Sequence, residues 1–297
     1  MSRILTVALC GLAWAVPAGA QQLDHSTAIG LGYSHLSLDG EGANAYSLEG
    51  ESILRFGQIE TGVDLGFNRL NEDGSRVDQT SVEIAPSYWF TPGFGIGVYG
   101  ARDTLDFEGT DLTLNSYGVE AQVRAAAMSG TLFVGETDVD LLGLDATTKD
   151  VGLRVRADLT PQASVWGSMV RSDIEDTDSD ARTWGIGGSL MVNDGFSTFA
   201  SYQSSEIDGT GGDVNVAAIG MSWTTFVGGQ EVMLSGEYAS ASGSSMLGSS
   251  DGNRVSLGAT ILLGDAQQKR TPAHTVTHNT LRGERNGLSG LFGSFGF

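Results

Sequence analysis

Residues 59–68 read Ile59-Glu60-Thr61-Gly62-Val63-Asp64-Leu65-Gly66-Phe67-Asn68, with the large apolar side chains at odd positions and polar or small ones at even positions. Successive side chains of a β-strand point to opposite faces, so a period of two predicts a strand. Residues 151–158 repeat the pattern, with apolar Val151, Leu153 and Val155 at alternate positions. One face of each strand could therefore meet lipid while the other meets water.

The alternation recurs along the chain in blocks of about ten residues that are separated by turn residues, which is typical of a transmembrane β-barrel. We therefore expect an all-β, antiparallel up-and-down barrel of about 14 strands over residues 21–263. The ninth and twelfth candidates have an irregular pattern, so 12 or 16 strands stay open. The candidates are 26–38, 43–54, 58–69, 77–90, 93–101, 112–126, 130–141, 149–159, 162–171, 182–192, 196–205, 213–225, 230–240 and 253–263.

The first 20 residues match a secretory signal peptide, which predicts export and a place in the outer membrane. Arg3 supplies the positive start, residues 4–16 are apolar, and Ala18-Gly19-Ala20 fits the cleavage pattern. The one cysteine of the chain, Cys10, lies inside this segment. The mature protein is then expected to have no disulfide and no thiol chemistry.

The connections between the strand candidates predict which end of the barrel is which. Every second connection is a tight turn such as Thr91-Pro92-Gly93 or Val227-Gly228-Gly229, which is expected on the periplasmic side. The other connections read as longer outer loops, and residues 102–111 and 172–181 are acidic. Their carboxylates could bind divalent cations weakly and bridge lipopolysaccharide phosphates. These loop acids are Asp106, Glu108, Asp111, Asp173, Glu175, Asp176 and Asp178.

Aromatic side chains gather near the tight turns, as expected of a girdle at a membrane interface. They are Phe56, Trp89, Phe90, Phe94, Phe196 and Phe226. Residues 21–263 thus resemble a small Gram-negative outer-membrane barrel of the porin type, in architecture and without a diagnostic motif. In trimeric general porins the third outer loop folds into the channel and carries acids. The corresponding loop here, around Asp106-Phe107-Glu108-Gly109, is much shorter. Trimers are common in that family, but no residue pattern identifies a subunit interface.

The polar rows of the strands are expected to line the lumen. We consider two hypotheses for their charges: a transverse field between acids and arginines that sets ion selectivity, or salt bridges within the wall. Small residues at other inward positions, such as Gly62, Gly152 and Gly185, suggest a lumen that is open to water. The predicted pore-lining residues are Glu60, Asp64, Glu83, Glu120, Arg124, Arg154, Arg156 and Glu237.

The charge of the chain is strongly acidic, −20 overall. Residues 21–264 carry 11 basic and 34 acidic residues, whereas the C-terminal tail, residues 264–297, carries a net charge of +2. This field disfavours nucleic acid as a partner and favours cations. The tail could be a flexible periplasmic segment, a plug drawn into the acidic lumen or a last strand pair, and a disordered or loosely docked tail is the favoured interpretation. Its end, Leu291 to Phe297, resembles the signal by which barrels reach the outer-membrane assembly machinery.

These features predict a porin-like passive channel for small hydrophilic solutes or ions, with no catalytic residues, cofactor or metal. A non-conducting structural or adhesive barrel is the first alternative. A barrel hydrolase is the second, and it would need His35 beside a serine and an acid or amide. The other histidines, His25, His274 and His278, are expected to be solvated near the rim or the terminus. A soluble exported all-β protein is the last alternative.

Overall fold

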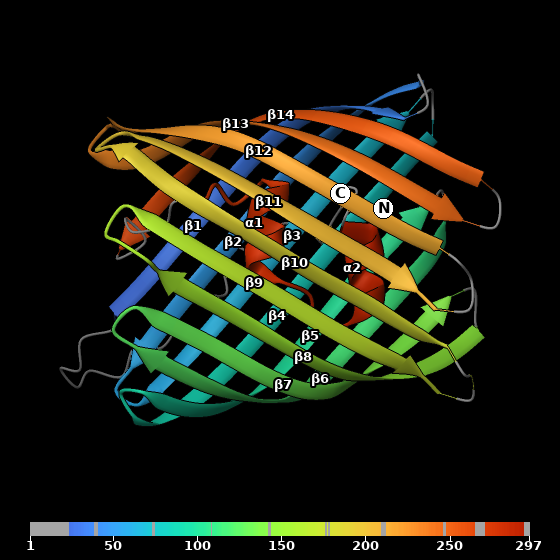
Figure 1. Ribbon diagram of the computed structural model, residues 1–297, viewed down its shortest axis with the longest axis horizontal. Coiled ribbons are helices and arrows are strands. Elements are labelled where there is room, and N and C mark those ends of the chain that lie inside the picture. Colours follow the sequence, from blue (N-terminus) through green and yellow to red (C-terminus); the bar gives the residue numbers. More distant parts are fainter. Residues whose placement is uncertain are drawn as a thin grey trace.

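Fourteen antiparallel strands close into a single barrel in the computed structural model of the chain (Figure 1). It describes residues 24–38, 41–72, 75–107, 109–141, 144–175, 177, 179–208, 212–245, 248–264 and 271–293. The signal peptide expected at residues 1–20 lies outside this range. The strands are β1 (Asp24–Leu38), β2 (Glu41–Phe56), β3 (Ile59–Glu72), β4 (Ser75–Thr91), β5 (Phe94–Phe107), β6 (Thr110–Ala125), β7 (Met128–Leu141), β8 (Leu144–Asp158), β9 (Ala163–Ile174), β10 (Asp180–Asn193), β11 (Phe196–Ile207), β12 (Gly212–Val227), β13 (Gln230–Ser245) and β14 (Gly248–Gly264).

The first and last strands pair with each other and close the wall. Ile29 of β1 lies opposite Ile261 of β14, and the ladder runs from Ser26 to Leu38. Closure gives every strand a neighbour on both sides, which a strand needs in hydrocarbon because no water is there to satisfy its backbone. The predicted barrel and its 14 strands are confirmed.

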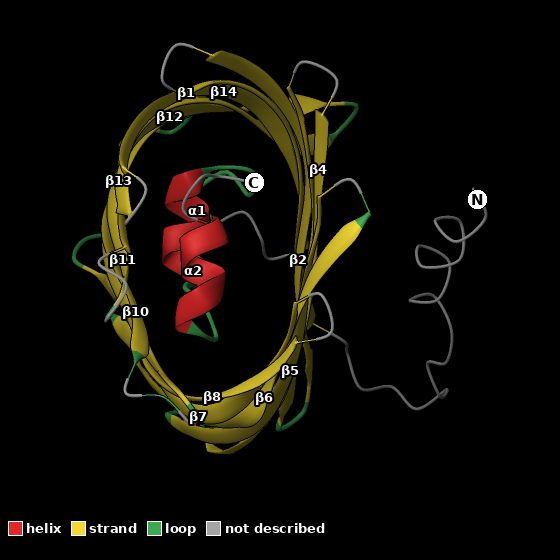
Figure 2. Ribbon diagram, turned by 90° about the vertical axis from the view of Figure 1, so that its right-hand side faces the viewer, coloured by secondary structure: helices red, strands yellow, loops and turns green. Residues whose placement is uncertain are grey.

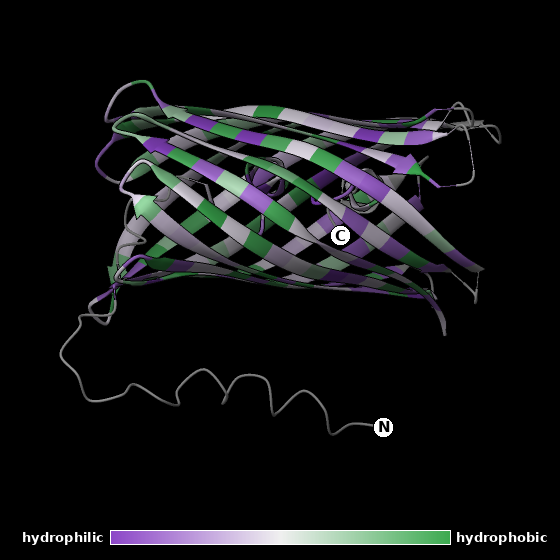
Figure 3. Ribbon diagram, turned by 90° about the horizontal axis from the view of Figure 1, so that it is seen from below, coloured by the Kyte–Doolittle hydropathy of each residue, from purple (hydrophilic) through white to green (hydrophobic). Residues whose placement is uncertain are grey.

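Side chains sort by face as the alternation predicted. The row Val255, Leu257 and Ile261 on β14 points outward, with exposed fractions of 53%, 63% and 39%. Hydrophobic and hydrophilic residues alternate along the strands in Figure 3. The barrel therefore presents an apolar outer surface, which belongs in a bilayer.

Exposed aromatic side chains lie toward both ends of the barrel. Phe56, Phe90, Phe94 and Phe226 point outward near the tight turns, as expected. Tyr33, Tyr46, Tyr117, Trp184, Tyr202 and Tyr238 form a second outward group toward the other end. Trp89 departs from the expectation because its side chain is buried on the inner face, beneath the guanidinium of Arg124.

The prediction of long outer loops in the acidic segments is wrong. Strand β5 continues to Phe107 and β6 begins at Thr110, so the hairpin includes most of residues 102–111. Leu105 and Leu112 pair across this hairpin, and both are buried on the inner face. Ladder hydrogen bonds and this apolar contact outweigh the local acidity. The strand bounds consequently leave short connections at both ends of the barrel. Glu108, Asp176 and Asp178 lie outside the described residues.

The tail forms two short helices inside the barrel, α1 (Val276–Arg282) and α2 (Gly287–Gly293) (Figure 2). Helix α1 packs against β9 to β12, and α2 against β9 to β11. Residues 271–293 therefore lie inside the lumen (Figure 2), one of the three places considered for the tail, and they form no last strand pair. None of the described helices is long and apolar enough to cross a membrane. We call residues 271–293 the plug.

Large side chains from the wall fill part of the lumen that the sequence predicted to be open. A Cβ at Gly187 would lie 2.7 Å from the Trp166 ring, and Phe133 packs over Gly152 in the same manner. Trp166 and Phe133 are 3% and 1% exposed. Gly152 and Gly187 therefore make room for rings on the neighbouring strand instead of widening the lumen.

Candidate functional site

The first turn of α1 is fixed to the wall by Glu237 of β13. The Glu237 carboxylate accepts hydrogen bonds from the backbone N–H of Val276 at 2.8 Å and of Thr277 at 3.1 Å. The Thr275 hydroxyl caps the same helix by accepting from the N–H of His278 at 3.1 Å. Backbone N–H groups at the start of a helix have no partner within the helix, and here the Glu237 carboxylate and the Thr275 hydroxyl satisfy them. The helix dipole also makes this end of α1 favourable for the negative charge of Glu237.

Polar wall residues meet the rest of the plug. The Ser201 hydroxyl bonds to that of Thr277 at 3.1 Å, and the Thr183 hydroxyl donates to the Gly287 carbonyl at 3.1 Å. On the opposite wall Asn286 donates to Ser116 at 2.9 Å, and Ser289 donates to Asp103 at 2.9 Å. The inward rows that were predicted to meet water therefore meet the plug over much of their length.

Close packing against wall glycines complements these hydrogen bonds. A Cβ at Gly30 would lie 2.9 Å from Ala273, and one at Gly32 would lie 3.0 Å from the His274 ring. A Cβ at Gly185 would lie 2.6 Å from the Thr280 methyl group. A larger residue at any of these positions would push the plug inward, so the wall is shaped to receive it.

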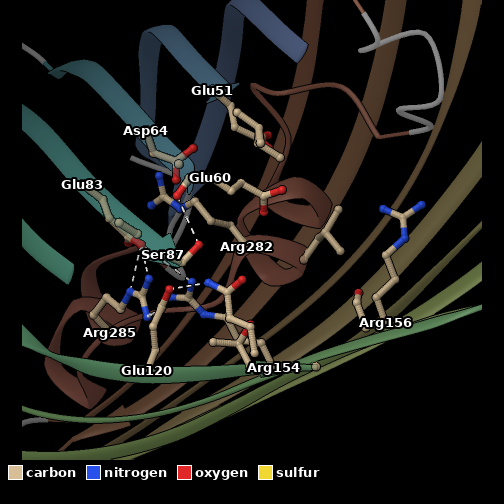
Figure 4. A pocket seen from close by; sticks show the side chains of 18 of the residues that line it. Glu51, Glu60, Asp64, Glu83, Ser87, Glu120, Arg154, Arg156, Arg282 and Arg285 are labelled. Carbon is tan, nitrogen blue, oxygen red and sulfur yellow. Dashed lines mark hydrogen bonds and ion pairs between the residues drawn. The ribbon is translucent and has the colours of Figure 1, made fainter. Parts of the chain in front are cut away.

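Arg285 crosses from the plug to the wall formed by β4 to β7 (Figure 4). Its Nε donates to Glu83 at 2.8 Å and its Nη1 donates to Glu120 at 2.8 Å. The guanidinium carbon lies 4.1 Å from the centre of the Tyr99 ring and 5.1 Å from that of Phe133. The two rings meet edge to face, with centres 5.7 Å apart. We call Glu83, Tyr99, Glu120 and Phe133 the cradle.

Two arginines of the wall also pair with acids across strands that are not neighbours. Arg124 of β6 binds Glu60 of β3 at 2.9 Å. Arg154 of β8 lies 3.9 Å from Glu83 of β4 and donates to the Gly283 carbonyl at 3.2 Å. Both pairs join residues of the wall on strands that are not neighbours, so the structure brings predicted acids and arginines together.

The structure places all eight predicted pore-lining side chains on the inner face. Arg156 bonds to Ser164 at 3.3 Å and lies 3.4 Å from Asp158. Asp64 lines the same cavity as Glu60 and Glu83. The sequence argument missed Arg282 and Arg285 as partners of these residues. The one feature of the sequence that pointed to them was the net positive charge of the tail, in contrast to the net charge of −23 on residues 21–264.

A cavity of about 360 Å³ lies between the plug and the inner face of β2 to β8. Five acids and four arginines line it, so it is polar and close to charge balance. Gly62 and Ala85 add small side chains, and His278 borders it from α1. The charged lining residues are Glu51, Glu60, Asp64, Glu83, Glu120, Arg154, Arg156, Arg282 and Arg285.

The described loop acids lie at the rim and have nearby partners. Asp106 accepts from the Gly109 N–H at 2.9 Å, Asp173 pairs with Arg171 at 2.8 Å, and Glu175 pairs with Lys149 at 2.8 Å. Asp111 lies opposite Asp106 in the β5–β6 ladder. No group of three or more His, Cys, Asp or Glu that could hold a metal ion occurs within the described ranges.

The histidines of the plug are buried, which corrects their expected solvation. His274 Nε2 lies 3.1 Å from the Ser235 hydroxyl, and His278 Nε2 lies 3.3 Å from Glu51. Burial lowers the pKa of His274 from its ordinary value, and the nearby Arg254 and His278 lower it further. His35 Nδ1 lies 3.1 Å from the Asn44 amide oxygen on the exposed surface. Ser235 and His274 are both buried between the wall and the plug.

Comparison with solved structures identifies the fold. An anion-selective porin from Comamonas acidovorans matches 82% of this chain and 100% of its own, with a TM-score of 0.54 and 11% identity. This chain has the fold of an outer-membrane β-barrel porin. A Pseudomonas aeruginosa FadL homologue covers 80% of this chain and 90% of its own (TM-score 0.53, 10% identity). OmpT, an outer membrane protein of Vibrio cholerae, covers 84% and 99% (TM-score 0.51, 9% identity).

Comparison of the sequence itself finds no relative. No protein-family model matches the chain, and no curated protein does. At about a tenth identity the structural likeness concerns the barrel alone. The plug and the cradle therefore have to be interpreted from their own geometry.

Proposed function

We propose that the protein is a passive outer-membrane channel for small polar solutes, and that its own C-terminal segment closes it. One observation carries this proposal: a 14-stranded wall with a polar inner face encloses a segment that takes no part in the strand ladder. Barrels of eight strands are filled by their own side chains, whereas wider barrels leave a lumen. Here the lumen is wide enough to hold two helices.

The plug is attached in a way that suits reversible closure. It contacts the wall through hydrogen bonds, ion pairs and small-residue packing, and the described part has few large apolar anchors. Val276 packs on Val216, Ala218 and Ala239, and Leu288 packs beside Leu105 and Leu114. Polar contacts can be exchanged for water or solute when a segment moves, whereas a large buried apolar surface resists separation.

We also propose that the open channel prefers cations. Support comes from the net charge of −23 on residues 21–264 and from Asp64 and Glu83, which would lose the nearby charges of Arg282 and Arg285 if the plug left, while Glu60 keeps its wall partner Arg124. Charged side chains that line a pore set its ion selectivity. Mutation of Glu60 to Gln should therefore lower the cation preference.

Single-channel recording of the refolded mature protein in a planar bilayer tests the channel. A salt gradient across the bilayer reads the selectivity from the reversal potential. We expect rare openings that favour cations, and a smaller reversal potential for Glu60→Gln. Lys149→Gln, which removes a rim ion pair with Glu175, is the matched control and should leave the reversal potential unchanged. Openings that favour anions would contradict the cation preference.

A non-conducting structural or adhesive barrel is the second candidate. The observation that favours it is the number of polar contacts that fix the plug, including the buried pairs of Arg285 with Glu83 and Glu120. Silence from a folded, inserted barrel at all voltages would support this candidate and overturn the channel. We infer no enzymatic activity, because the enclosed pair of Ser235 and His274 has no third group at His274 Nδ1 in the described structure.

A further inference from the structure

The cradle belongs to the strands of the wall, whereas its occupant, Arg285, lies outside them. Glu83, Tyr99, Glu120 and Phe133 belong to the four consecutive strands β4 to β7, each of which pairs with the next. Arg285 belongs to the plug, which no ladder holds. The binding geometry is consequently built into the barrel and would persist if the plug moved.

The cradle is matched to a guanidinium group in both charge and shape. Two carboxylates accept from Arg285 on its edges, and two aromatic rings lie within about 5 Å of its guanidinium carbon. A planar guanidinium donates in a fixed fork and stacks on aromatic rings, whereas an ammonium is a compact, strongly hydrated charge. The site is therefore expected to prefer a guanidinium group to an ammonium group of the same charge.

Removing Arg285 without a replacement would leave an unfavourable site. The side chains of Glu120 and Glu83 are 1% and 12% exposed. The next described cation is Arg154, 3.9 Å from Glu83. Glu120 would lose its ion pair with Arg285 and keep the hydrogen bond from Gln122, and removing one partner of a buried ion pair is strongly destabilising. Plug release is thus favoured when another cation enters as Arg285 leaves.

A path to the cradle exists within the barrel. Glu83, Glu120 and Arg285 all line the cavity of about 360 Å³ beside the plug, which falls in the size range of small-molecule sites. Ser52, Ser129 and Thr131 add hydroxyl groups to its lining. A small solute in this cavity would lie next to the guanidinium of Arg285 and could compete with it.

We propose that the cradle binds small guanidinium compounds as the solute of the channel, and that Arg285 occupies it as a stand-in when the channel is closed. Entry of the solute displaces Arg285 and frees the plug. This inference deepens the proposed function and rests on it for transport. Binding itself can be measured without transport, so failure of one is distinguishable from failure of the other.

Arg285→Ala in the full chain tests the site, with methylguanidinium as the probe and tetramethylammonium as a monovalent control cation. By calorimetry in detergent we expect methylguanidinium to bind at least tenfold more tightly than tetramethylammonium. The double variant Arg285→Ala/Glu120→Gln should lose most of this binding. Equal affinity of the single and the double variant for methylguanidinium would overturn the proposal.

A second measurement on the unmodified protein covers the case in which Arg285→Ala does not fold. Hydrogen exchange of residues 276–282 is followed as either cation is added at millimolar concentration. We expect methylguanidinium to speed exchange several-fold more than tetramethylammonium does. Equal exchange with the two cations would contradict displacement of Arg285, even if the bilayer recordings show a channel.

Discussion

Glu237 of β13 accepts a hydrogen bond from the backbone N–H of Thr277 in α1 at 3.1 Å, and its second carboxylate oxygen accepts from Val276 at 2.8 Å. Glu237 is 4% exposed and Thr277 is fully buried. One carboxylate of the wall therefore holds two donors of the plug that would otherwise be unpaired in the interior. Glu237 fixes α1, while the cradle fixes the segment that precedes α2.

Glu237→Gln should loosen α1 without unfolding the barrel. An amide offers one carbonyl oxygen in place of two charged oxygens, and a hydrogen bond to a charged group contributes about 1.5–3 kcal/mol. Hydrogen exchange of residues 276–282 should accelerate by about tenfold or more, as 1.4 kcal/mol corresponds to tenfold. Glu231→Gln, nearer the tight-turn end of the same strand, should leave the exchange of α1 unchanged. Acceleration of the strands to the same extent would mean that the whole barrel was weakened.

Gly187→Ala should destabilise the barrel, because its Cβ would lie 2.7 Å from the buried Trp166 ring. Overpacking of this kind typically costs about 1–3 kcal/mol. Urea unfolding in micelles measures the change. Gly100→Ala is the matched control, since a Cβ there meets no atom within 4 Å and its backbone is not in the left-handed region. A similar loss of stability for both variants would show that the cost comes from replacing glycine in a strand and not from a clash with the Trp166 ring.

Acid should weaken docking of the plug through His274. Burial lowers the pKa of this imidazole, so the docked form binds fewer protons than the released form, whose ordinary pKa is about 6.5. The docked form is therefore destabilised as the pH falls below that value. The equilibrium constant between the docked and the released plug changes by up to about tenfold per pH unit. His274→Gln should remove this dependence.

The measurement is the exchange rate of residues 276–282 between pH 7 and pH 5, corrected for the intrinsic rate. Burial raises the pKa of Glu284 in the same plug, which acts in the opposite direction in both proteins. The difference between the wild type and His274→Gln isolates the imidazole. If the two corrected profiles coincide, His274 does not couple to docking.

The barrel could be predicted from the sequence because alternation is a local signal. Val255, Leu257 and Ile261 lie on the outer face as their spacing required, and strand pairing follows from consecutive hairpins. Strand ends were less accurate. Polar residues such as Asp103 and Asp106 predict a loop, but Leu105 between them pairs with Leu112, so the hairpin continues through this segment. Pairing depends on the partner strand, which a local pattern does not contain.

The site could be predicted only in part. Glu83 and Glu120 were placed in the lumen by their parity, but their partner Arg285 lies 202 and 165 residues away along the chain. Residues 271–293 have weak strand character and no strong helix signal, and two seven-residue helices are stable only inside the wall that encloses them. The charge difference between tail and barrel was the one available signal, and it fixed no particular contact.

The plug must move for the channel to conduct, and a removable cross-link between α1 and the wall can prevent that movement. The Ser201 hydroxyl of β11 and the Thr277 hydroxyl of α1 are 3.1 Å apart, so Ser201→Cys/Thr277→Cys should form a disulfide with little rearrangement. Once the predicted signal peptide and its Cys10 are removed, no other cysteine competes. The account predicts no conductance from the oxidised protein and cation-preferring openings after reduction, while each single variant conducts throughout. Conductance that is equal before and after reduction would show that solutes pass without movement of α1, and would contradict closure by the plug.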